Sequence, residues 1–243
     1  MDGWIEAGCV AALLVLVGGG IGLAGRRNFS VRWLLVAAAL VLLNDALLTR
    51  LHGALPHLLP HGRWNWEGKV LALAATLIVA SLPAFGWRRC GLTLRQAEGS
   101  LRSAAPLAGL YLLFFTGLAF AFPEHGAPDT ETVAFQLTLP GLEEEPFYRG
   151  VLLYALSRAF TARVELLGVE WGWGALLSCA LFGLAHAFGY RHGRFSFDVV
   201  TMALTALPSL LAVWLRLRTG SLLLPVLLHN FGNSASLLIR PGN

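Results

Sequence analysis

The stretch "LPGLEEEPFYRG", residues 139–150, places three consecutive glutamates and an arginine inside a chain that is otherwise strongly apolar. Of the 243 residues, 56% are hydrophobic and 13% are charged, against roughly 25% charged in a soluble domain. The mean hydropathy of +0.64 is typical of a membrane protein. An ionisable side chain in hydrocarbon costs roughly 2.5–3.5 kcal/mol, so such residues usually face a bundle interior and serve a function. The stretch therefore predicts a polar site enclosed by membrane helices.

Long apolar runs with almost no charge recur on both sides of this stretch. Most of them approach the roughly 20 residues that a helix needs to cross a ~30 Å hydrocarbon core. The runs are residues 5–24, 31–48, 70–87, 104–122, 174–188, 199–215 and 222–239. The segment 139–160 is then either an eighth crossing or a helix buried among the others. We predict an all-α membrane protein, a bundle of about eight transmembrane helices around a polar, water-accessible cavity, forming a single domain over residues 1–243.

Several other classes of protein fit the sequence poorly. The first apolar run follows no basic segment, so a retained span is favoured over a cleaved signal peptide. The cysteines Cys9, Cys90 and Cys179 are odd in number and lie far apart, which favours packing roles over disulfides or a structural zinc site. The formal charge of +4 comes without a dense basic patch, so no nucleic-acid partner is expected.

The basic residues mark the ends of the predicted spans. They are more frequent in the loops that follow the first, third, fifth and seventh spans than in the opposite loops. By the positive-inside rule, this bias places both termini outside the cytoplasm of a multi-pass protein, which we assign to a prokaryotic plasma membrane. The aromatic stretch "RWNWEGK" (63–69) and the pair Trp171 and Trp173 are interpreted as anchors at the membrane surface.

Helical spacing separates the three glutamates from one another. Glu145 and Arg149 are four residues apart and can form an ion pair on one helix face. Glu144 points about 100° away from Glu145 and is predicted to be the unpaired carboxylate. Glu143 is interpreted as a residue at the helix start, where the helix dipole favours negative charge. Pro146 follows directly, so the helix either begins near Glu143 or bends at this point.

Two further clusters of polar residues lie in later apolar runs. His186 follows Phe182 by one helical turn in "FGLAH", and His229 shares a helix face with Asn233 in "HNFGN". A fourth candidate, the pair Asn44 and Asp45 at the end of the second run, is interpreted as interfacial.

These groups could together hydrolyse a peptide bond without a covalent intermediate. A carboxylate beside an imidazole can take a proton from an attacking water, while a second imidazole and an amide can stabilise the oxyanion. A zinc site formed by Glu144, His186 and His229 is an alternative, but the HExxH signature is absent, and metal-free catalysis is favoured. No GxSxG elbow appears, so a serine nucleophile fits less well.

The motifs "EEPFYRG" (144–150), "FGLAH" (182–186) and "HNFGN" (229–233) resemble, in order, the EExxxR, FxxxH and HxxxN motifs of the CAAX protease and bacteriocin-processing family of intramembrane glutamate proteases. The resemblance covers about residues 131–238. It implies that Glu144 is the general base, assisted by His186, and that His229 and Asn233 form the oxyanion site. It also implies that Glu145, Arg149 and Phe182 support the site and that the fold is a bundle of eight membrane helices.

The predicted activity is therefore that of an intramembrane endopeptidase with no cofactor. Its expected partners are the lipid bilayer and a membrane-anchored or exported protein substrate, cleaved at a C-terminal sorting tail or a leader. With both termini outside, Glu144 and His186 are expected near the outer ends of their spans. The alternatives are a non-catalytic immunity or scaffold protein of the same fold and a proton-coupled transporter. A transporter should show inverted repeats or paired broken helices, which the sequence lacks.

Overall fold

The computed structural model describes residues 2–51, 62–123 and 126–239 of the chain. The first half contains the helices α1 (Asp2–Ala24), α2 (Val31–Ala46), α3 (Trp66–Ser81) and α4 (Ser100–Ala121). A 3-10 turn, η1 (Arg26–Asn28), precedes α2, and a π-helical turn, η2 (Leu47–Leu51), follows it. The second half contains α5 (Thr130–Glu145), the π-helical segment η4 (Pro146–Leu152), α6 (Leu153–Ala159), α7 (Trp173–Ala187), α8 (Val199–Thr219) and α9 (Leu223–Leu238).

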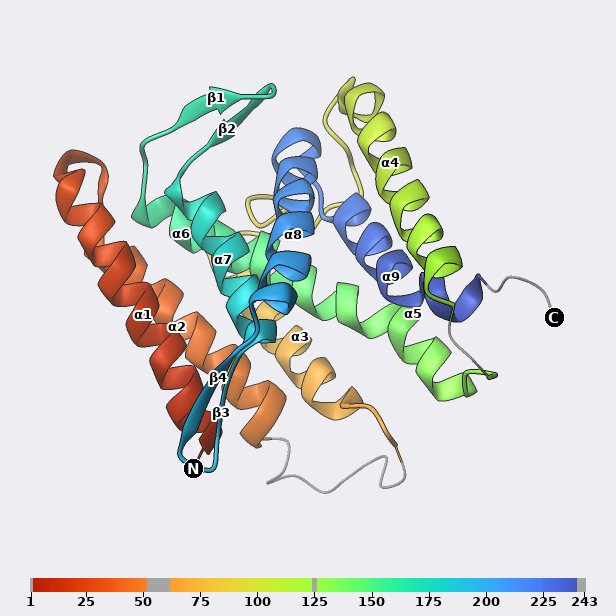
Figure 1. Ribbon diagram of the computed structural model, residues 1–243. Coiled ribbons are helices and arrows are strands. Elements are labelled where there is room, and N and C mark those ends of the chain that lie inside the picture. The colour runs from red at the N-terminus through yellow and green to blue at the C-terminus, as the bar shows by residue number, and fades with distance from the viewer. Residues whose placement is uncertain (1, 52–61, 124–125, 240–243) are drawn as a thin grey trace.

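The predicted all-α membrane fold is confirmed. In the described part of the chain, α5, η4 and α6 follow one another without a break, and counting them as one gives eight helical segments. Among the described residues, four helices are long and apolar enough to cross a membrane: Gly3–Ala24, Val31–Thr49, Ser100–Ala121 and Val199–Thr219. Figure 1 shows α1 and α2 side by side at one edge and α4 and α9 at the other, with the remaining helices between them.

The third predicted span, 70–87, was too long at its C-terminal end. Helix α3 ends at Ser81, and the capping residue Leu82 is extended with ψ 142°. The residue before a proline is disfavoured in the helical region, and Pro83 follows Leu82. The chain turns here and enters the connection to α4.

Two short β-hairpins, at opposite ends of the bundle in Figure 1, were not predicted. Strand β1 (Val164–Leu166) pairs with β2 (Val169–Trp171), and β3 (Phe188–Arg191) pairs with β4 (Arg194–Phe197). Both turns contain a residue followed by glycine with positive φ at both positions, Leu167–Gly168 and His192–Gly193. Two-residue hairpin turns of this kind favour glycine. The backbone N–H of Tyr190 donates to Glu6 at 3.1 Å, which ties the second hairpin to α1.

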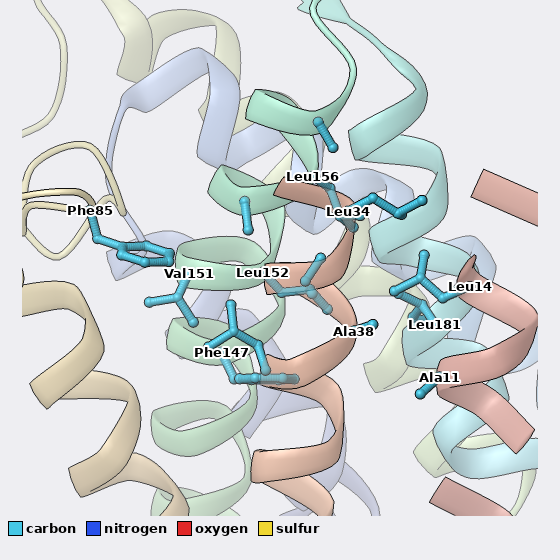
Figure 2. Close-up of a cluster of buried hydrophobic side chains, with 14 of the residues drawn as sticks. Ala11, Leu14, Leu34, Ala38, Phe85, Phe147, Val151, Leu152, Leu156 and Leu181 are labelled. Carbon is cyan, nitrogen blue, oxygen red and sulfur yellow. The ribbon is translucent and has the colours of Figure 1, made fainter. Parts of the chain in front are cut away.

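The hydrophobic core surrounds η4 and α6. Figure 2 shows Phe147, Val151, Leu152 and Leu156 from this segment packed among side chains of neighbouring elements. These neighbours are Ala11 and Leu14 of α1, Leu34 and Ala38 of α2, Leu181 of α7, and Phe85 of the connection after α3. The charged motif therefore lies on a helix buried among the others, which was one of the two positions expected for it.

Candidate active site

The three sequence motifs meet at one cavity of about 200 Å³. Glu144 and Glu145 reach it from the end of α5, His186 from the last turn of α7, and His229 and Asn233 from α9. The other lining residues are Tyr111, Phe115, Arg149, Phe182, Leu204, Thr205, Pro208, Ser209, Leu211, Ala212, Leu215, Pro225 and Leu228. Residues more than 80 positions apart in the sequence are thus brought within a few ångströms of one another.

Glu144 has two differently placed carboxylate oxygens. Oε1 accepts a hydrogen bond from Nζ of Lys69 at 2.5 Å. Oε2 lies 3.6 Å from Nε2 of His229 and 3.9 Å from Nε2 of His186, and it is buried with no hydrogen-bond partner among the described residues. One oxygen is therefore tied to a cation, and the other faces both imidazoles.

Hydrogen bonds on the far side of each ring fix the two imidazoles. Nδ1 of His186 lies 2.8 Å from the carbonyl oxygen of Phe182, which can only accept, so Nδ1 carries the proton. In the neutral ring, this leaves the lone pair of Nε2 facing Glu144. Nδ1 of His229 lies 2.7 Å from Oε1 of Glu145, and we infer that this nitrogen also donates. A carboxylate that binds the ring nitrogen facing away from the site fixes the orientation of the histidine ring.

Glu145 also forms the predicted ion pair with Arg149, with 3.3 Å between Oε2 and Nε. Both side chains are almost completely buried. The guanidinium of Arg149 lies over the ring of Phe182, with Cζ 4.0 Å from the ring centroid, and the same ring contacts His186 at 4.6 Å between centroids. The aromatic residue of the second motif therefore packs between the arginine of the first motif and its own histidine.

The predictions that Glu144 is unpaired and that Glu143 begins a helix are wrong. Helix α5 begins at Thr130 with Asp129 as its N-cap, so Glu143 lies in its last turn. The Glu143 side chain is fully buried, and its Oε2 accepts from Lys69 at 2.7 Å. The same ammonium therefore neutralises both Glu143 and Glu144.

Pro146 neither starts the helix nor ends it. It follows α5 directly and opens the π-helical segment η4, which continues into α6. A proline removes one backbone hydrogen bond in a helix interior. The π segment that Pro146 opens belongs to a rare class of helix that is frequently found at functional sites. Glu144 thus lies in the middle of a helical segment that runs from Thr130 to Ala159, and the expectation that it lies near the outer end of its span is wrong.

The comparison with known protein families supports the same region. Residues 129–235 match the family model described as type II CAAX prenyl endopeptidase Rce1-like. Over this region the chain is similar to that family. No curated protein matches the chain, and no solved structure matches it.

The Rce1-like region begins at the N-cap of α5 and ends within α9. It contains all three motifs and every cavity residue named above except Tyr111 and Phe115, and it does not contain Lys69, which binds Glu144. Helices α1 to α4 lie outside the region, and Lys69 comes from one of them. The expected resemblance to the CAAX protease and bacteriocin-processing family is confirmed for this part of the chain.

Two residues close to the candidate site were not predicted from the sequence. Lys69 was counted among the interfacial residues of 63–69, and Asn230 was passed over beside His229. The amide of Asn230 accepts from the backbone N–H of Gly141 at 2.7 Å and donates to the carbonyl of Thr138 at 3.0 Å. It thereby joins α9 to α5. Signals for both residues existed, since Lys69 supplies a cation for the surplus glutamates and Asn230 is a polar residue within an apolar helix.

Other predicted residues take structural positions. Asn44 is buried, contrary to its interfacial interpretation, and interacts with the Glu143 carboxylate. Trp64 stacks on Phe135 of α5 with 4.8 Å between ring centroids, and Trp66 meets the same ring edge-on. These tryptophans hold the start of α3 against α5, and their role at the membrane surface stays a prediction.

The remaining features of the sequence are the cysteines and the alternative zinc site. Cys9, Cys90 and Cys179 are free thiols, and burial raises the pKa of Cys90, in the connection between α3 and α4, to about 11. A thiol of this kind is not a nucleophile at neutral pH. Across residues 2–51, 62–123 and 126–239, no group of three His, Cys, Asp or Glu side chains has an arrangement that could hold a metal ion. Metal-free catalysis stays a prediction.

Proposed function

We propose that the protein is an intramembrane endopeptidase in which Glu144 activates a water molecule. The observation that carries this proposal is the position of Oε2 of Glu144, which is buried, without a hydrogen-bond partner, and directed at the Nε2 atoms of two histidines. Separations of 3.6 and 3.9 Å are too long for direct hydrogen bonds. They suit a water that bridges the carboxylate and an imidazole.

The proposed reaction gives each of these groups a role. Glu144 takes a proton from the water, with the lone pair of His186 Nε2 orienting it, and the water oxygen bonds to the carbonyl carbon of the scissile peptide. His229 donates from Nε2 to the oxyanion, and the Glu145 carboxylate at its Nδ1 stabilises the imidazolium form. Asn233, one turn further along α9, provides a second donor. Glu144 then returns its proton to the departing amine as the C–N bond breaks.

The proposed substrate is a protein segment embedded in the bilayer or tethered to it. His186 lies in the last turn of α7, directly before β3, and the contact between Tyr190 and Glu6 brings this end of α7 to the N-terminal end of α1. If both termini lie outside the cytoplasm, the site serves exported substrates. Reporter fusions at the two termini test this orientation, and finding both ends in the cytoplasm would overturn it.

The activity is tested with purified protein in liposomes and two quenched fluorescent peptides. One peptide carries a farnesylated C-terminal Cys-a-a-X tail, and the other carries an unmodified apolar C-terminal segment. We expect cleavage of the unmodified peptide and its loss, by roughly 10³-fold or more, in Glu144→Gln. The matched control is Glu165→Gln on the exposed β1 strand, which should cleave normally. A wild-type protein that cleaves neither peptide, or a Glu144→Gln variant that cleaves as well as the wild type, would refute the proposal.

A further inference from the structure

The buried acidic cluster needs more positive charge than its own helix provides. Glu143, Glu144 and Glu145 are consecutive and buried, and Arg149 pairs with Glu145. Two carboxylates then remain without a cation from α5, η4 or α6. An unpaired carboxylate in an apolar site is strongly unfavourable, so each of the two has to take up a proton or bind a cation from elsewhere in the fold.

Lys69 supplies that cation, and it is the sole lysine of the chain, which has 18 basic residues in all. Its ammonium lies 2.7 Å from Glu143 Oε2 and 2.5 Å from Glu144 Oε1, with 13% of the side chain exposed. A lysine ammonium is a compact charge with three donors, whereas an arginine guanidinium is a planar fork suited to one carboxylate at a time. A lysine therefore suits the bridging of two adjacent carboxylates.

The backbone around Lys69 is anchored on both sides. Lys69 lies in the first turn of α3, where the N-cap Asn65 accepts from the N–H of Gly68 at 2.9 Å and donates to the carbonyl of Leu48 at 2.6 Å. The start of α3 is thus fixed to the π turn that follows α2. From the same side, Asn44 of α2 interacts with Glu143, so one of the two carboxylates that hold the lysine is itself held.

We propose that Lys69 is a positioning residue for the reaction proposed above, with Glu143 as its support. By binding Oε1 of Glu144, the ammonium fixes the rotation of the carboxylate so that Oε2 faces His186 and His229. The inference rests on the proposed function. It adds that helices outside the Rce1-like region complete the site.

The kinetic test separates positioning from simple charge compensation. Lys69→Met removes the ammonium, and Lys69→Met with Glu143→Gln removes the ammonium together with the carboxylate that it also neutralises. If Lys69 positions Glu144, the double variant folds, keeps its KM for the apolar peptide within about threefold, and loses roughly 100-fold in kcat, as expected for a misplaced catalytic group. Lys69→Arg should recover part of that loss. A double variant with wild-type kcat would overturn the inference.

A second test needs no substrate, because the chain has a single lysine. Protein labelled with ¹⁵N at the lysine ζ position gives one side-chain ammonium signal. We expect that signal to shift in Glu143→Gln and in Glu144→Gln, and to stay in place in the Glu165→Gln control. If the chemical shift of that signal is unchanged in Glu144→Gln, Lys69 does not bind this carboxylate. That result overturns the inference, whatever the activity of the protein. Absence of cleavage by the wild-type protein would instead refute the proposed function.

Discussion

Asn230 provides the sharpest test of how α9 is held against α5. Its side chain is buried and makes two hydrogen bonds to the α5 backbone, at 2.7 Å to Gly141 N–H and 3.0 Å to Thr138 O. The helices approach closely at this point, since a Cβ on Gly141 would lie 2.8 Å from the carbonyl oxygen of Val226. Asn230→Ala leaves both backbone groups without their partners in a place that water does not readily reach.

The size of the effect depends on the solvent of the unfolded state. An unsatisfied buried group costs about 1–3 kcal/mol in a soluble protein, but interhelical hydrogen bonds in a membrane average ~0.6 and reach ~1.7 kcal/mol. The membrane values apply here, because the separated helices still find polar partners in the bilayer. For two hydrogen bonds we expect a loss of about 1–3 kcal/mol in the free energy of unfolding.

Activity should fall as well, because His229 precedes Asn230 on the same helix. A shift of α9 relative to α5 lengthens the 2.7 Å contact between His229 and Glu145, and a displacement of about 1 Å can cost roughly 100-fold in rate.

Unfolding in sodium dodecyl sulfate, followed by tryptophan fluorescence, measures the stability. The matched control is Asn233→Ala, one turn away and exposed, which should leave stability within about 0.5 kcal/mol. Equal stability of Asn230→Ala and the wild type would refute the reasoning.

Three further predictions concern charge and metal. Glu145→Gln should lower kcat by 100-fold or more, because His229 loses the carboxylate that favours its imidazolium form. The rate of peptide hydrolysis measures this effect, and a loss in kcat below threefold would contradict the prediction. Hydrogen bonds from Thr201 and Val200 hold the pKa of Asp198, the N-cap of α8, below its ordinary value of 3.8. The Asp198 carboxylate therefore stabilises the folded protein fully above pH 4, and this contribution is lost as the pH falls further. Between pH 3 and 6, the thermal unfolding midpoint should depend less on pH in Asp198→Asn than in the wild type. An identical pH dependence in the two proteins would count against the cap. Cleavage should survive dialysis against a chelator such as EDTA, and activity restored only by added zinc would favour the alternative metal site.

The helices followed from the sequence because hydrocarbon imposes a simple rule on long segments. Runs such as 5–24 and 199–215 needed only length and apolar composition to be found, and α1 and α8 include them. The hairpins were missed because each strand has three or four residues, too few for a periodic signal. Their turns, Leu167–Gly168 and His192–Gly193, carried the available evidence.

The site was predictable wherever its residues share a helix. The spacing of Glu145 and Arg149 predicted the ion pair that the structure contains. Spacing gives no information on contacts between helices, so the second partner of Glu145, His229, and the bonds from Asn230 to α5 were not foreseen. The helix start at Thr130 was also missed, because the residues before Leu139 are more polar than a typical span.

The prediction that Glu144 is unpaired was wrong because it considered contacts within one helix only. The helical spacing correctly excluded an ion pair between Glu144 and Arg149, but it gave no information on partners from other helices. Charge balance would have corrected that prediction, because three buried carboxylates with one arginine favour another cation nearby. Since Lys69 is the sole lysine of the chain and lies within an apolar helix, it was the natural candidate. The part of the chain outside the Rce1-like region therefore does more than surround the site, because α3 provides the cation that two of its three glutamates share.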